Sequence, residues 1–521
     1  MGRRLFLLVV FAMVWCCGGV GGEGAFATEG QVPLRTHGPL RVSPENPRYF
    51  ADAENRIVYL TGSHHWENFQ DVTEPFDYQA YLDRLVTLNH NFIRLWVSDT
   101  MRSSGGWLLH PPTEANPVSP LPYLRTGPGA ALDGGPRVDL VRFNPRYFER
   151  LRDRVIKAGQ RGLYVSVMLF QGFGVSERGA WQAHPFNGAN NLNEIDGDDD
   201  HDGVGTEIQR APSGLVLAAQ EAYVRQVLDT LHDLDNVLYE VVNEAVPESV
   251  PWQYHFIRFI KRYERDRGFM THPVGMTFFQ LGEFGGGDNA TLFDSEADWI
   301  SPGGYTKYAR NPPVADGRKV LILDTDHIHG IGGDHNFVWE SFFRGYNPIY
   351  MDPFGAVHEL TIGEPVANEP QHERARLAMG ETRRWADQLD LQRLTPQGEL
   401  ASTGYCLAER GEEYLVYVSA PANPLSAAGT TRPITINLVG SVVPLRSTGS
   451  IWKRDGRGRA THSSGERTCD HRALPGGRAN SSSEGQIDNR AAAVTASADR
   501  SMGFRLPAVP PHLLAAGCGS G

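Results

Sequence analysis

Short runs of apolar residues alternate with longer amphipathic stretches between about residue 55 and residue 355. The short runs are rich in β-branched and aromatic residues, as buried strands are, and the longer stretches repeat their apolar residues with the period of a helix. Eight strands are predicted on this basis, at residues 57–61, 92–97, 163–170, 237–242, 274–279, 299–300 continuing toward 305, 319–323 and 348–351. Helices are predicted at residues 78–88, 145–159, 215–234, 251–267 and 337–344.

Eight strands with intervening helices predict an α/β fold, the (β/α)8 TIM barrel. A doubly wound open sheet shows the same alternation, but its nucleotide-binding form carries a glycine-rich turn after the first strand. The first predicted strand is instead followed by Gly62-Ser63-His64-His65, which does not match that turn. We therefore favour the barrel, and we assign it residues 28–385.

The pattern changes after the barrel. Residues 386–446 contain alternating stretches at 414–419 and 433–438 that are typical of short antiparallel strands, so a small β-rich C-terminal domain is predicted there. From residue 447 onward the apolar periodicity disappears and Arg, Ser, Gly and Ala accumulate. This composition predicts a low-complexity or disordered tail over residues 447–521.

Residues 1–27 have the features of a secretory signal peptide. Arg3 and Arg4 precede an apolar run over residues 5–14, and Ala25-Phe26-Ala27 fits a cleavage site. The apolar run is too short to span a bilayer, and no later stretch approaches the necessary length. We therefore expect a secreted or periplasmic protein with no membrane contact after cleavage.

The charge balance limits the kinds of partner that the protein is expected to bind. The chain has 49 basic and 61 acidic residues, a formal net charge of −12. A sequence-independent nucleic-acid-binding protein needs a basic surface, so no nucleic-acid partner is expected. The cysteines that would survive cleavage, Cys406, Cys469 and Cys518, are too widely spaced for a disulfide framework or a metal-ligand motif, so the fold must depend on its core.

Residues with useful chemistry follow most of the predicted strands. In a TIM barrel the carboxyl ends of all eight strands meet at one face, and that face carries the active site. The residues at these ends are His64, His65 and Trp66 for the first strand, Arg94 and Trp96 for the second, Gln171 for the third, Asn243 and Glu244 for the fourth, Tyr305 for the sixth, Asp324, Asp326 and His327 for the seventh, and Asp352 for the eighth. A ring of this kind would be unusual if packing were its only purpose.

The fourth predicted strand carries the most specific motif, Leu-Tyr-Glu-Val-Val-Asn-Glu-Ala at residues 238–245. With this motif the chain resembles the clan A glycoside hydrolases, of the family 5 or cellulase-like type, over residues 45–360. The resemblance implies that Glu244 is the general acid and base and that Asn243 holds the sugar 2-hydroxyl. It further implies that Arg94 and Tyr305 steady the nucleophile. Glycoside hydrolysis needs one protonated and one ionised carboxyl group, and a partly apolar pocket at a strand tip would keep Glu244 protonated.

The second carboxylate departs from the family pattern. The family usually has Glu at the end of the seventh strand, whereas this chain has Asp324 and Asp326. If the strand stays regular, both side chains face the same way. We prefer Asp326, which falls where the family often has Glu, and Asp324 then supports it or binds substrate. Asp is one methylene shorter than Glu, so both the retention typical of the family and an inverting mechanism stay open.

Aromatic and imidazole side chains at the same strand ends suit a sugar site. Trp66 and Trp96 could pack on the apolar face of a sugar ring, and His64, His65 and His327 could bind hydroxyl groups or tune the nucleophile. Each of them could equally be part of the core.

The long segment after the third predicted strand contains Asp198, Asp200 and Asp202, spaced as in a calcium loop. The match is incomplete, because Gln209 stands where a bidentate Glu is expected. A structural calcium ion and a solvated acidic loop are both open interpretations.

Taken together, the sequence predicts a secreted glycoside hydrolase that cleaves poly- or oligosaccharides with two carboxyl groups and requires no cofactor. One alternative is a non-catalytic carbohydrate-binding relative of such an enzyme. Another is a metal-dependent hydrolase on the same barrel, with a metal held by the His and Asp residues near the first and seventh strands. The sugar and its linkage are not predicted.

Overall fold

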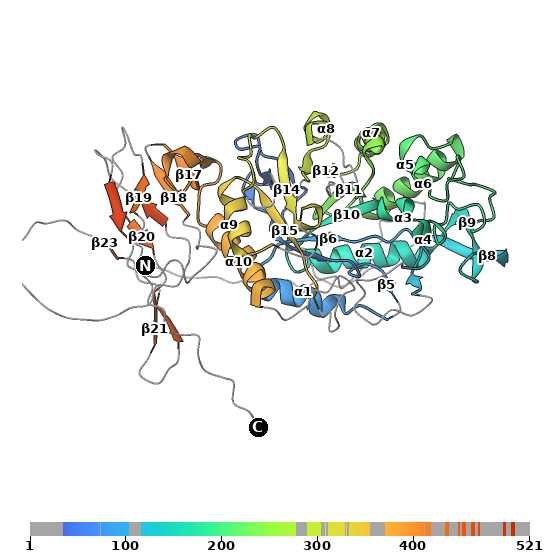
Figure 1. Cartoon of the computed structure of the whole chain (residues 1–521), viewed down its shortest axis with the longest axis horizontal. Helices are drawn as coiled ribbons and strands as arrows, with labels where there is room; N and C mark the ends of the chain where they lie inside the picture. Colours follow the sequence, from blue (N-terminus) through green and yellow to red (C-terminus); the bar gives the residue numbers. More distant parts are fainter. Residues whose placement is uncertain are drawn as a thin grey trace, which may run out of the picture. The chain divides into compact units, whose positions relative to one another are not determined.

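The computed structural model describes residues 35–72, 74–103, 116–277, 289–303, 308, 311–328, 330, 333–354, 370–410, 412–417 and a series of short strands between residues 433 and 505. Its central feature is a closed barrel of eight parallel strands (Figure 1). In barrel order these are β4 (Gly62–His65), β6 (Phe92–Leu95), β10 (Tyr164–Gln171), β11 (Val237–Asn243), β12 (Val274–Thr277), β13 (Trp299–Ser301), β14 (Val320–Asp324) and β15 (Asn347–Met351). The predicted TIM barrel is confirmed.

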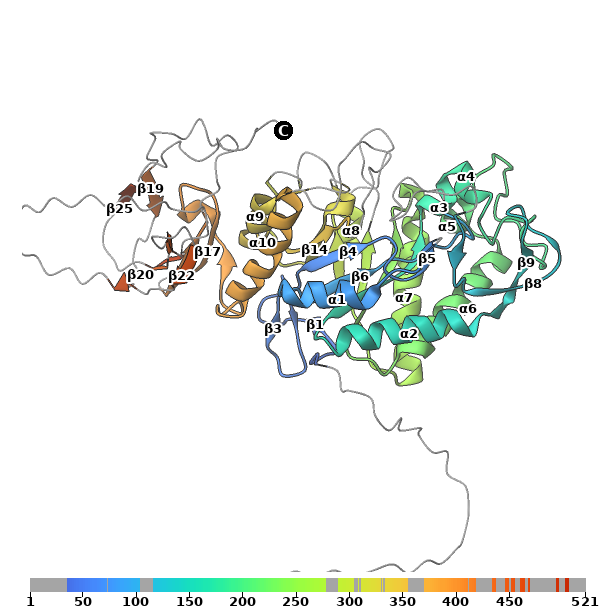
Figure 2. The same cartoon turned by 90° about the horizontal axis from the view of Figure 1, so that it is seen from below.

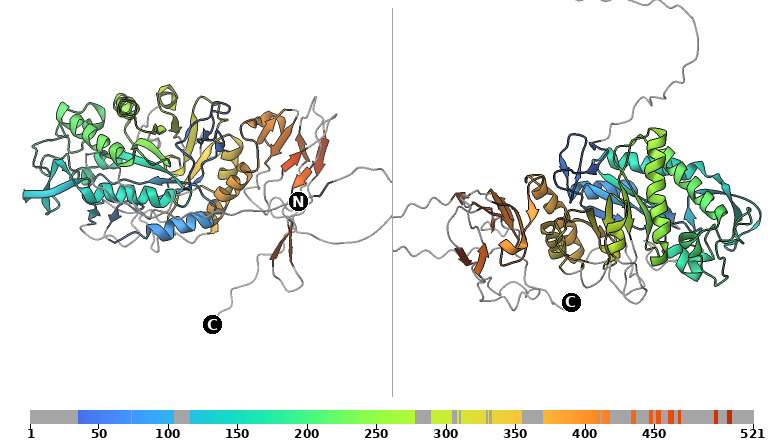
Figure 3. Two further views of the ribbon diagram at one scale, coloured as in Figure 1. Left: turned by 180° about the vertical axis from the view of Figure 1, so that it is seen from behind. Right: turned by 90° about the horizontal axis from the view of Figure 1, so that it is seen from above.

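Amphipathic helices cover the outside of the barrel (Figures 1 and 2). They are α1 (Tyr78–Thr87), α2 (Pro145–Gly159), α6 (Gly214–Leu231), α7 (Val250–Arg267), α8 (Asn289–Asp294), α9 (His335–Phe343) and α10 (Pro370–Ala386). Local sequence explains several of their ends, since Asp77, Asn144, Ser213 and Asp334 cap the helices that follow them. The helix α7, which Figure 3 shows running along the outside of the barrel, ends at Gly268, whose φ of 65° favours glycine. No helix within the described ranges is long and apolar enough to cross a membrane.

The predicted position of the first barrel strand was wrong. The apolar residues Ile57 and Val58 form β3 of a small antiparallel sheet with β1 (Arg41–Val42) and β2 (Phe50–Ala51). The barrel strand is the next segment, Gly62–His65, which consists of one glycine and three polar residues. Periodicity misses such a strand, because its polar side chains are buried against specific partners and not against a hydrophobic layer.

The inner layers of the barrel explain where its chemistry lies. Near the amino ends of the strands, Phe92, Leu238, Trp299 and Ile322 pack in one apolar cluster. Two residues further along their strands stand Arg94, Glu240 and Asp324, on the same faces, as the period of a strand requires. The apolar layer therefore closes the bottom of the barrel and leaves the charged layer at the carboxyl ends of the strands.

Two larger regions of secondary structure were not predicted. Between β6 and α2 lie β7 (Val118–Ser119), which pairs with β5 (Asp71–Val72) from the segment between β4 and α1, and a hairpin of β8 (Tyr123–Ala130) and β9 (Pro136–Phe143), which Figures 1 and 2 show at one end of the barrel. Side chains of this hairpin share a core with the segment after β10, which contains α3 (Phe173–Ser176), α4 (Arg178–Trp181) and α5 (Glu207–Arg210). The other region is α10, which packs beside α9.

After α10 the chain forms the predicted β-rich region. The strands β16 (Thr395–Pro396), β17 (Cys406–Glu409) and β18 (Glu413–Val416) make an antiparallel sheet, whose Leu407 and Leu415 share a core with α9 and α10. Further short strands follow, namely β19 (Pro433–Ile436), β20 (Arg446–Thr448), β21 (Ile451–Arg454), β22 (Ala460–Ser463), β23 (Arg467–Thr468), β24 (Ala493–Thr495) and β25 (Met502–Arg505), and most of them lie beyond residue 446. Because β25 pairs with β19, parts of the predicted tail have secondary structure. The domain boundaries at residues 385 and 446 stay predictions.

Gly62→Ala tests the contact between β4 and β6. A Cβ atom at Gly62 would lie 1.9 Å from the carbonyl oxygen of Phe92, its partner in the ladder. Overpacking of this kind typically costs about 1–3 kcal/mol, so we expect urea denaturation to show a loss of that size in the free energy of unfolding. Gly179→Ala, where the added atom meets open space in the helix α4, should not lower that free energy. Equal stability of the two variants would contradict the close approach of the strands.

Candidate active site

The Arg94 guanidinium is the centre of the charged layer. Its Nε donates to Glu240 Oε2 at 2.7 Å, its Nη2 donates to Glu240 Oε1 and Asn243 Oδ1, and its Nη1 donates to Asp326 Oδ2 at 2.9 Å. Asp324 Oδ2 lies 3.3 Å from the same Nη1. Burial would lower the pKa of Arg94, but the surrounding carboxylates outweigh burial and raise it, so this charge is permanent. The predicted site residues from β6, β11 and β14 are therefore brought together.

Asp324 is fully engaged by its neighbours. Its Oδ1 accepts from the backbone N–H of Asp326 at 2.9 Å and contacts His64 Nε2 at 2.9 Å, while its Oδ2 faces Arg94. Burial acts to raise the pKa of Asp324, but His64 and Arg94 outweigh it and hold the pKa well below its usual range. Asp324 is thus an ionised carboxylate whose oxygens are committed to holding other groups.

Asp326 is bound less completely. The strand β14 ends at Asp324, and a 3-10 turn over Thr325–His327 follows, so the strand does not stay regular as the parity argument assumed. Both aspartates nevertheless reach Arg94. Asp326 Oδ2 takes that hydrogen bond, whereas no hydrogen bond from the described residues reaches its Oδ1. Asp326 therefore has an oxygen available for a further partner, and Asp324 does not.

Glu244 follows directly after the end of β11. It is partly buried, and its backbone has a φ of 49°, the left-handed region that residues with side chains seldom adopt. Burial raises the pKa of Glu244 well above its usual range, the negative charge of Asp326 raises it further, and Arg94 opposes them. The described part of the chain gives its carboxyl group no hydrogen-bond partner. A protonated, uncommitted carboxyl group is what a general acid requires.

Asn243 is held from three sides. Its Oδ1 accepts from Arg94 Nη2 and lies 3.1 Å from His327 Nε2, and its Nδ2 donates to Gln171 Oε1 at 2.9 Å. His327 Nδ1 lies 2.8 Å from Ser301 Oγ on β13. Because the amide oxygen of Asn243 can only accept, His327 carries its proton on Nε2. Burial lowers the pKa of His327, in agreement with this neutral ring.

Sequence reasoning missed Glu240 and Ser301, and it noted Gln171 without giving it a role. Glu240 could have been found, because a charged residue inside a buried apolar strand needs a partner of opposite charge. That partner is Arg94, which is itself a charged residue inside the buried strand β6. Ser301 offered no such signal, since buried serine is common and its partner His327 lies in the turn that follows a different strand.

The two histidines of β4 point to opposite sides of the strand. His64 contacts Asp324 inside the barrel, and its ring is stacked with Trp96 at a centroid distance of 5.7 Å, so both belong to the site. His65 is instead stacked between Trp66 and Phe76, and burial lowers its pKa to about 3. His65 and Trp66 therefore lie in the packing outside the barrel. This placement does not support their predicted role in substrate binding. For His65 the reason is the alternation of side chains along a strand, whereas Trp66 follows the end of β4 and packs against His65.

Two further predictions concern other parts of the chain. Tyr305 lies outside the described residues. Asp198, Asp200 and Asp202 come together, with oxygen atoms within 4.8 Å of one another. Some of these oxygens accept hydrogen bonds from the backbone, since Asp198 caps the N–H groups of Asp202 and Gly203. Calcium binding by this loop stays a prediction.

The metal-dependent alternative meets a specific obstacle. His64, Asp324 and Asp326 place potential ligand atoms within 4.8 Å of one another. However, Arg94 Nη1 already lies between the two aspartates, at 2.9 Å and 3.3 Å, so the guanidinium supplies the positive charge that a divalent ion would supply. The cluster therefore fits a set of charged hydrogen-bonding groups better than a metal centre.

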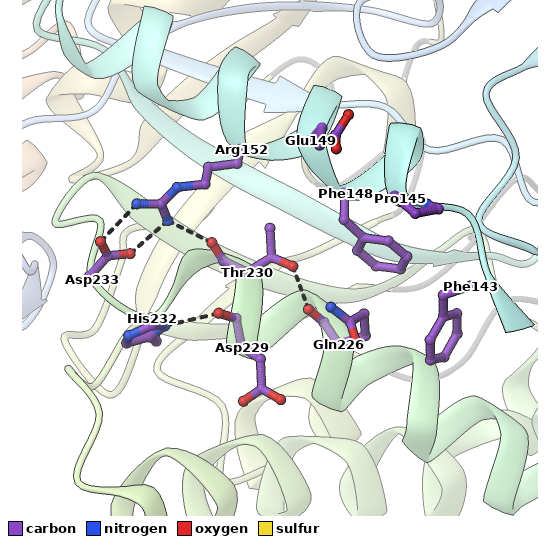
Figure 4. Close-up of a pocket in the computed structure, with 10 residues that line it drawn as sticks. All are labelled: Phe143, Pro145, Phe148, Glu149, Arg152, Gln226, Asp229, Thr230, His232 and Asp233. Atoms are coloured by element: carbon purple, nitrogen blue, oxygen red, sulfur yellow. Dashed lines mark hydrogen bonds and ion pairs between the residues drawn. The ribbon is translucent and has the colours of Figure 1, made fainter. Parts of the chain in front are cut away.

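Two cavities of the described structure lie away from these residues. One, of about 530 Å³, is on the outer side of the barrel between α2 and α6, where Figure 4 shows Arg152 bonded to Asp233, and Phe143 and Phe148 also line the cavity. The other, of about 570 Å³, lies at the amino ends of the strands, near Asn91 and Tyr164. Neither contains a predicted site residue, and a TIM barrel carries its active site at the opposite face from the second.

Among known proteins, one solved structure has a fold similar to this architecture. Residues 83–276 match a family described as a domain of unknown function, DUF6298. No curated protein sequence matches the chain. Among solved structures, a Bacteroides vulgatus protein assigned to the glycoside hydrolases has a TM-score of 0.53 at 12% identity, over 91% of this chain and 81% of that one. A family 5 glycoside hydrolase from the same organism has a TM-score of 0.48 at 13% identity, over 88% and 93% of the two chains. A family 5 mannosidase from Rhizomucor miehei has a TM-score of 0.42 at 10% identity, over 67% and 99%.

The fold defines the class. This chain has an eight-stranded TIM barrel, and its fold is similar to that of a protein assigned to the glycoside hydrolases. At such low identity the likeness establishes the fold and not the activity.

Replacing the two aspartates tests the origin of the raised pKa of Glu244. The charges of Asp326 and, to a lesser extent, Asp324 raise this pKa, so removing either charge should lower it. We expect Asp326→Asn to lower it more than Asp324→Asn, as measured by NMR titration of carbon-13-labelled glutamate. Asp200→Asn, in the distant acidic loop, should leave it unchanged. An unchanged pKa in both site variants would show that the aspartates do not act on Glu244.

Proposed function

We propose that the protein is a secreted glycoside hydrolase that cleaves the O-glycosidic bonds of poly- or oligosaccharides with Glu244 and Asp326. The observation that carries this proposal is the contrast between these two groups. Burial and the charge of Asp326 raise the pKa of Glu244, which has no hydrogen-bond partner among the described residues, while Asp326 is held by Arg94 and keeps one oxygen available. One protonated and one ionised carboxyl group are the minimum for cleaving a glycosidic bond.

The proposed reaction begins with proton transfer from Glu244 to the glycosidic oxygen. The bond between that oxygen and the anomeric carbon breaks, and the leaving alcohol takes the bonding electrons. Asp326 Oδ1 either forms a bond to the anomeric carbon, to be displaced later by water, or removes a proton from a water that attacks directly. Asn243 retains one Nδ2 hydrogen beyond its bond to Gln171, and this hydrogen can be donated to a sugar hydroxyl.

Asp326 is preferred to Asp324 because of what each oxygen already binds. Both oxygens of Asp324 hold Arg94, His64 or the backbone of Asp326. A nucleophile or base must release a lone pair to the reacting atom, and Asp324 could do so only by breaking these contacts. In this proposal Asp324 orients Asp326 and Arg94, and no metal or redox cofactor takes part.

A non-catalytic carbohydrate-binding protein is the second candidate. It is favoured by one observation, the aspartate in place of the family's glutamate at the end of β14. A carboxylate drawn back by one methylene could leave a sugar bound and uncleaved. The two candidates differ in whether any glycoside is turned over.

Glu244→Gln separates the two candidates. Hydrolysis of a panel of aryl glycosides and plant polysaccharides should fall by about 10²–10⁴-fold in this variant, while sugar binding persists, since the general acid is lost and the site keeps its shape. Asp326→Asn should cause a comparable loss and Asp324→Asn a smaller one. Wild-type protein that binds a sugar but cleaves nothing in the panel would contradict the enzyme. If Asp324→Asn were the more damaging change, the two aspartates would exchange roles.

The product anomer identifies the mechanism. Proton NMR of the first turnovers should show retained configuration if Asp326 reaches the anomeric carbon, which is the family's usual course. Inverted configuration would show that the shorter side chain leaves space for a water and that Asp326 is a base. Wild-type enzyme on a single aryl glycoside is sufficient, and the spectrum must be recorded before the product equilibrates.

A further inference from the structure

The segment after β10 lies directly against the backbone of Glu244. The strands β10 and β11 pair up to Gln171 and Asn243, and the N–H of Gly172 then donates to the carbonyl oxygen of Asn243 at 2.6 Å. A Cβ atom at Gly172 would lie 2.3 Å from the carbonyl oxygen of Glu244 and 2.6 Å from the Cα and N atoms of Ala245. Side-chain carbons do not approach backbone atoms so closely, so a residue other than glycine fits here only if the backbone of Glu244 moves.

Space, and not backbone conformation, is the reason for the glycine. Gly172 has a φ of −78°, which any residue can adopt. The strained residue is Glu244, whose φ is 49°. The left-handed backbone conformation costs a residue with a side chain about 1–3 kcal/mol, and it persists only where the surrounding structure holds it. The turn at Glu244 is held on one side by the contact with Gly172, and Thr277 Oγ1 donates to the preceding Val242 carbonyl at 2.6 Å.

We propose that Gly172 is a positioning residue that sets the place of the Glu244 carboxyl group through this backbone contact. The inference rests on the proposed function of Glu244 as the general acid. It assigns to the tip of β10 two separate tasks, since Gln171 orients the Asn243 side chain while Gly172 orients the backbone that carries Glu244. Displacement of Glu244 would weaken proton transfer to the leaving oxygen and leave Arg94, Asp324 and Asp326 in place.

Gly172→Ala tests this with two leaving groups of different basicity. A phenolate needs a proton as the C–O bond breaks, whereas 2,4-dinitrophenolate departs without one. We expect kcat/KM of Gly172→Ala on phenyl β-glycosides to fall by about 100-fold, which is the effect of moving a catalytic group by about 1 Å. On the 2,4-dinitrophenyl β-glycoside of the same sugar the fall should be less than about fivefold, because general acid catalysis contributes little there. Glu244→Gln should show the same selectivity.

Two variants serve as controls. Gly179→Ala adds the same methyl group in the same segment, where it meets open space, and should leave kcat/KM unchanged on both substrates. Gln171→Ala releases Asn243, which under the proposed function binds a sugar hydroxyl and not the leaving group, so it should lower kcat/KM on both substrates alike. Equal losses on both substrates in Gly172→Ala, or a leaving-group dependence in Gln171→Ala, would overturn the assignment.

Failure of the proposed function would be recognised separately. The wild-type protein could prove inactive on polysaccharides and on phenyl and dinitrophenyl β-glycosides of glucose, mannose and galactose. That result would contradict the proposed enzymatic function, but it would not test whether Gly172 positions the backbone of Glu244. Crystal structures of wild type and Gly172→Ala would then provide the answer. A shift of the Glu244 backbone is expected, and an unmoved Glu244 beside a well-ordered added methyl group would overturn the inference.

Discussion

The buried charge of Arg94 is the constraint on which the site depends. Its side chain is 2% exposed, and burial of an unpaired guanidinium would cost several kcal/mol. The cost is offset by carboxylates from β11 and from β14 and its following turn, which reach the same side chain from different parts of the barrel. The barrel therefore has to close with these strands in one relative position. Removing Arg94 would leave Glu240, Asp324 and Asp326 buried without a counter-charge.

Three carboxylates around one guanidinium leave an excess of negative charge among the described residues of the strand tips. This excess has two consequences that act in the same direction. It adds to the effect of burial in raising the pKa of Glu244, through the charges of Asp326 and Asp324, which favours the protonated form. Under the proposed function it would also favour the positive charge that develops on the sugar ring as the glycosidic bond breaks. A single electrostatic feature thus connects the packing of the barrel with proton donation by Glu244 and with stabilisation of the transition state.

Most of the fold could be predicted, because the other barrel strands carry apolar runs that stand out from their polar surroundings. The strand β4 could not be predicted, since its histidines are buried by specific contacts. His64 contacts Asp324, which is far away in the sequence, and His65 contacts Trp66 and Phe76, which lie in the segment after β4. The hairpin of β8 and β9 was missed for a related reason. Its strands pack on the segment after β10, and their outer faces are exposed, so their sequence shows no continuous apolar run.

By itself the sequence determined the class of fold, the strand that delivers Asn243 and Glu244, and the set of charged residues available at the strand tips. These features are local, since they follow from side-chain periodicity and from residues adjacent in the chain. Tertiary structure decided which of Asp324 and Asp326 keeps an oxygen available, that His65 faces away from the barrel, and that Glu240, Ser301 and Gln171 support the site. Glu240 and Asn243 are three positions apart on β11, so alternation along a regular strand would place their side chains on opposite faces. Both nevertheless accept hydrogen bonds from Arg94. Each of these outcomes depends on contacts between strands distant in the chain, where the exact register and the end of each strand select the partner.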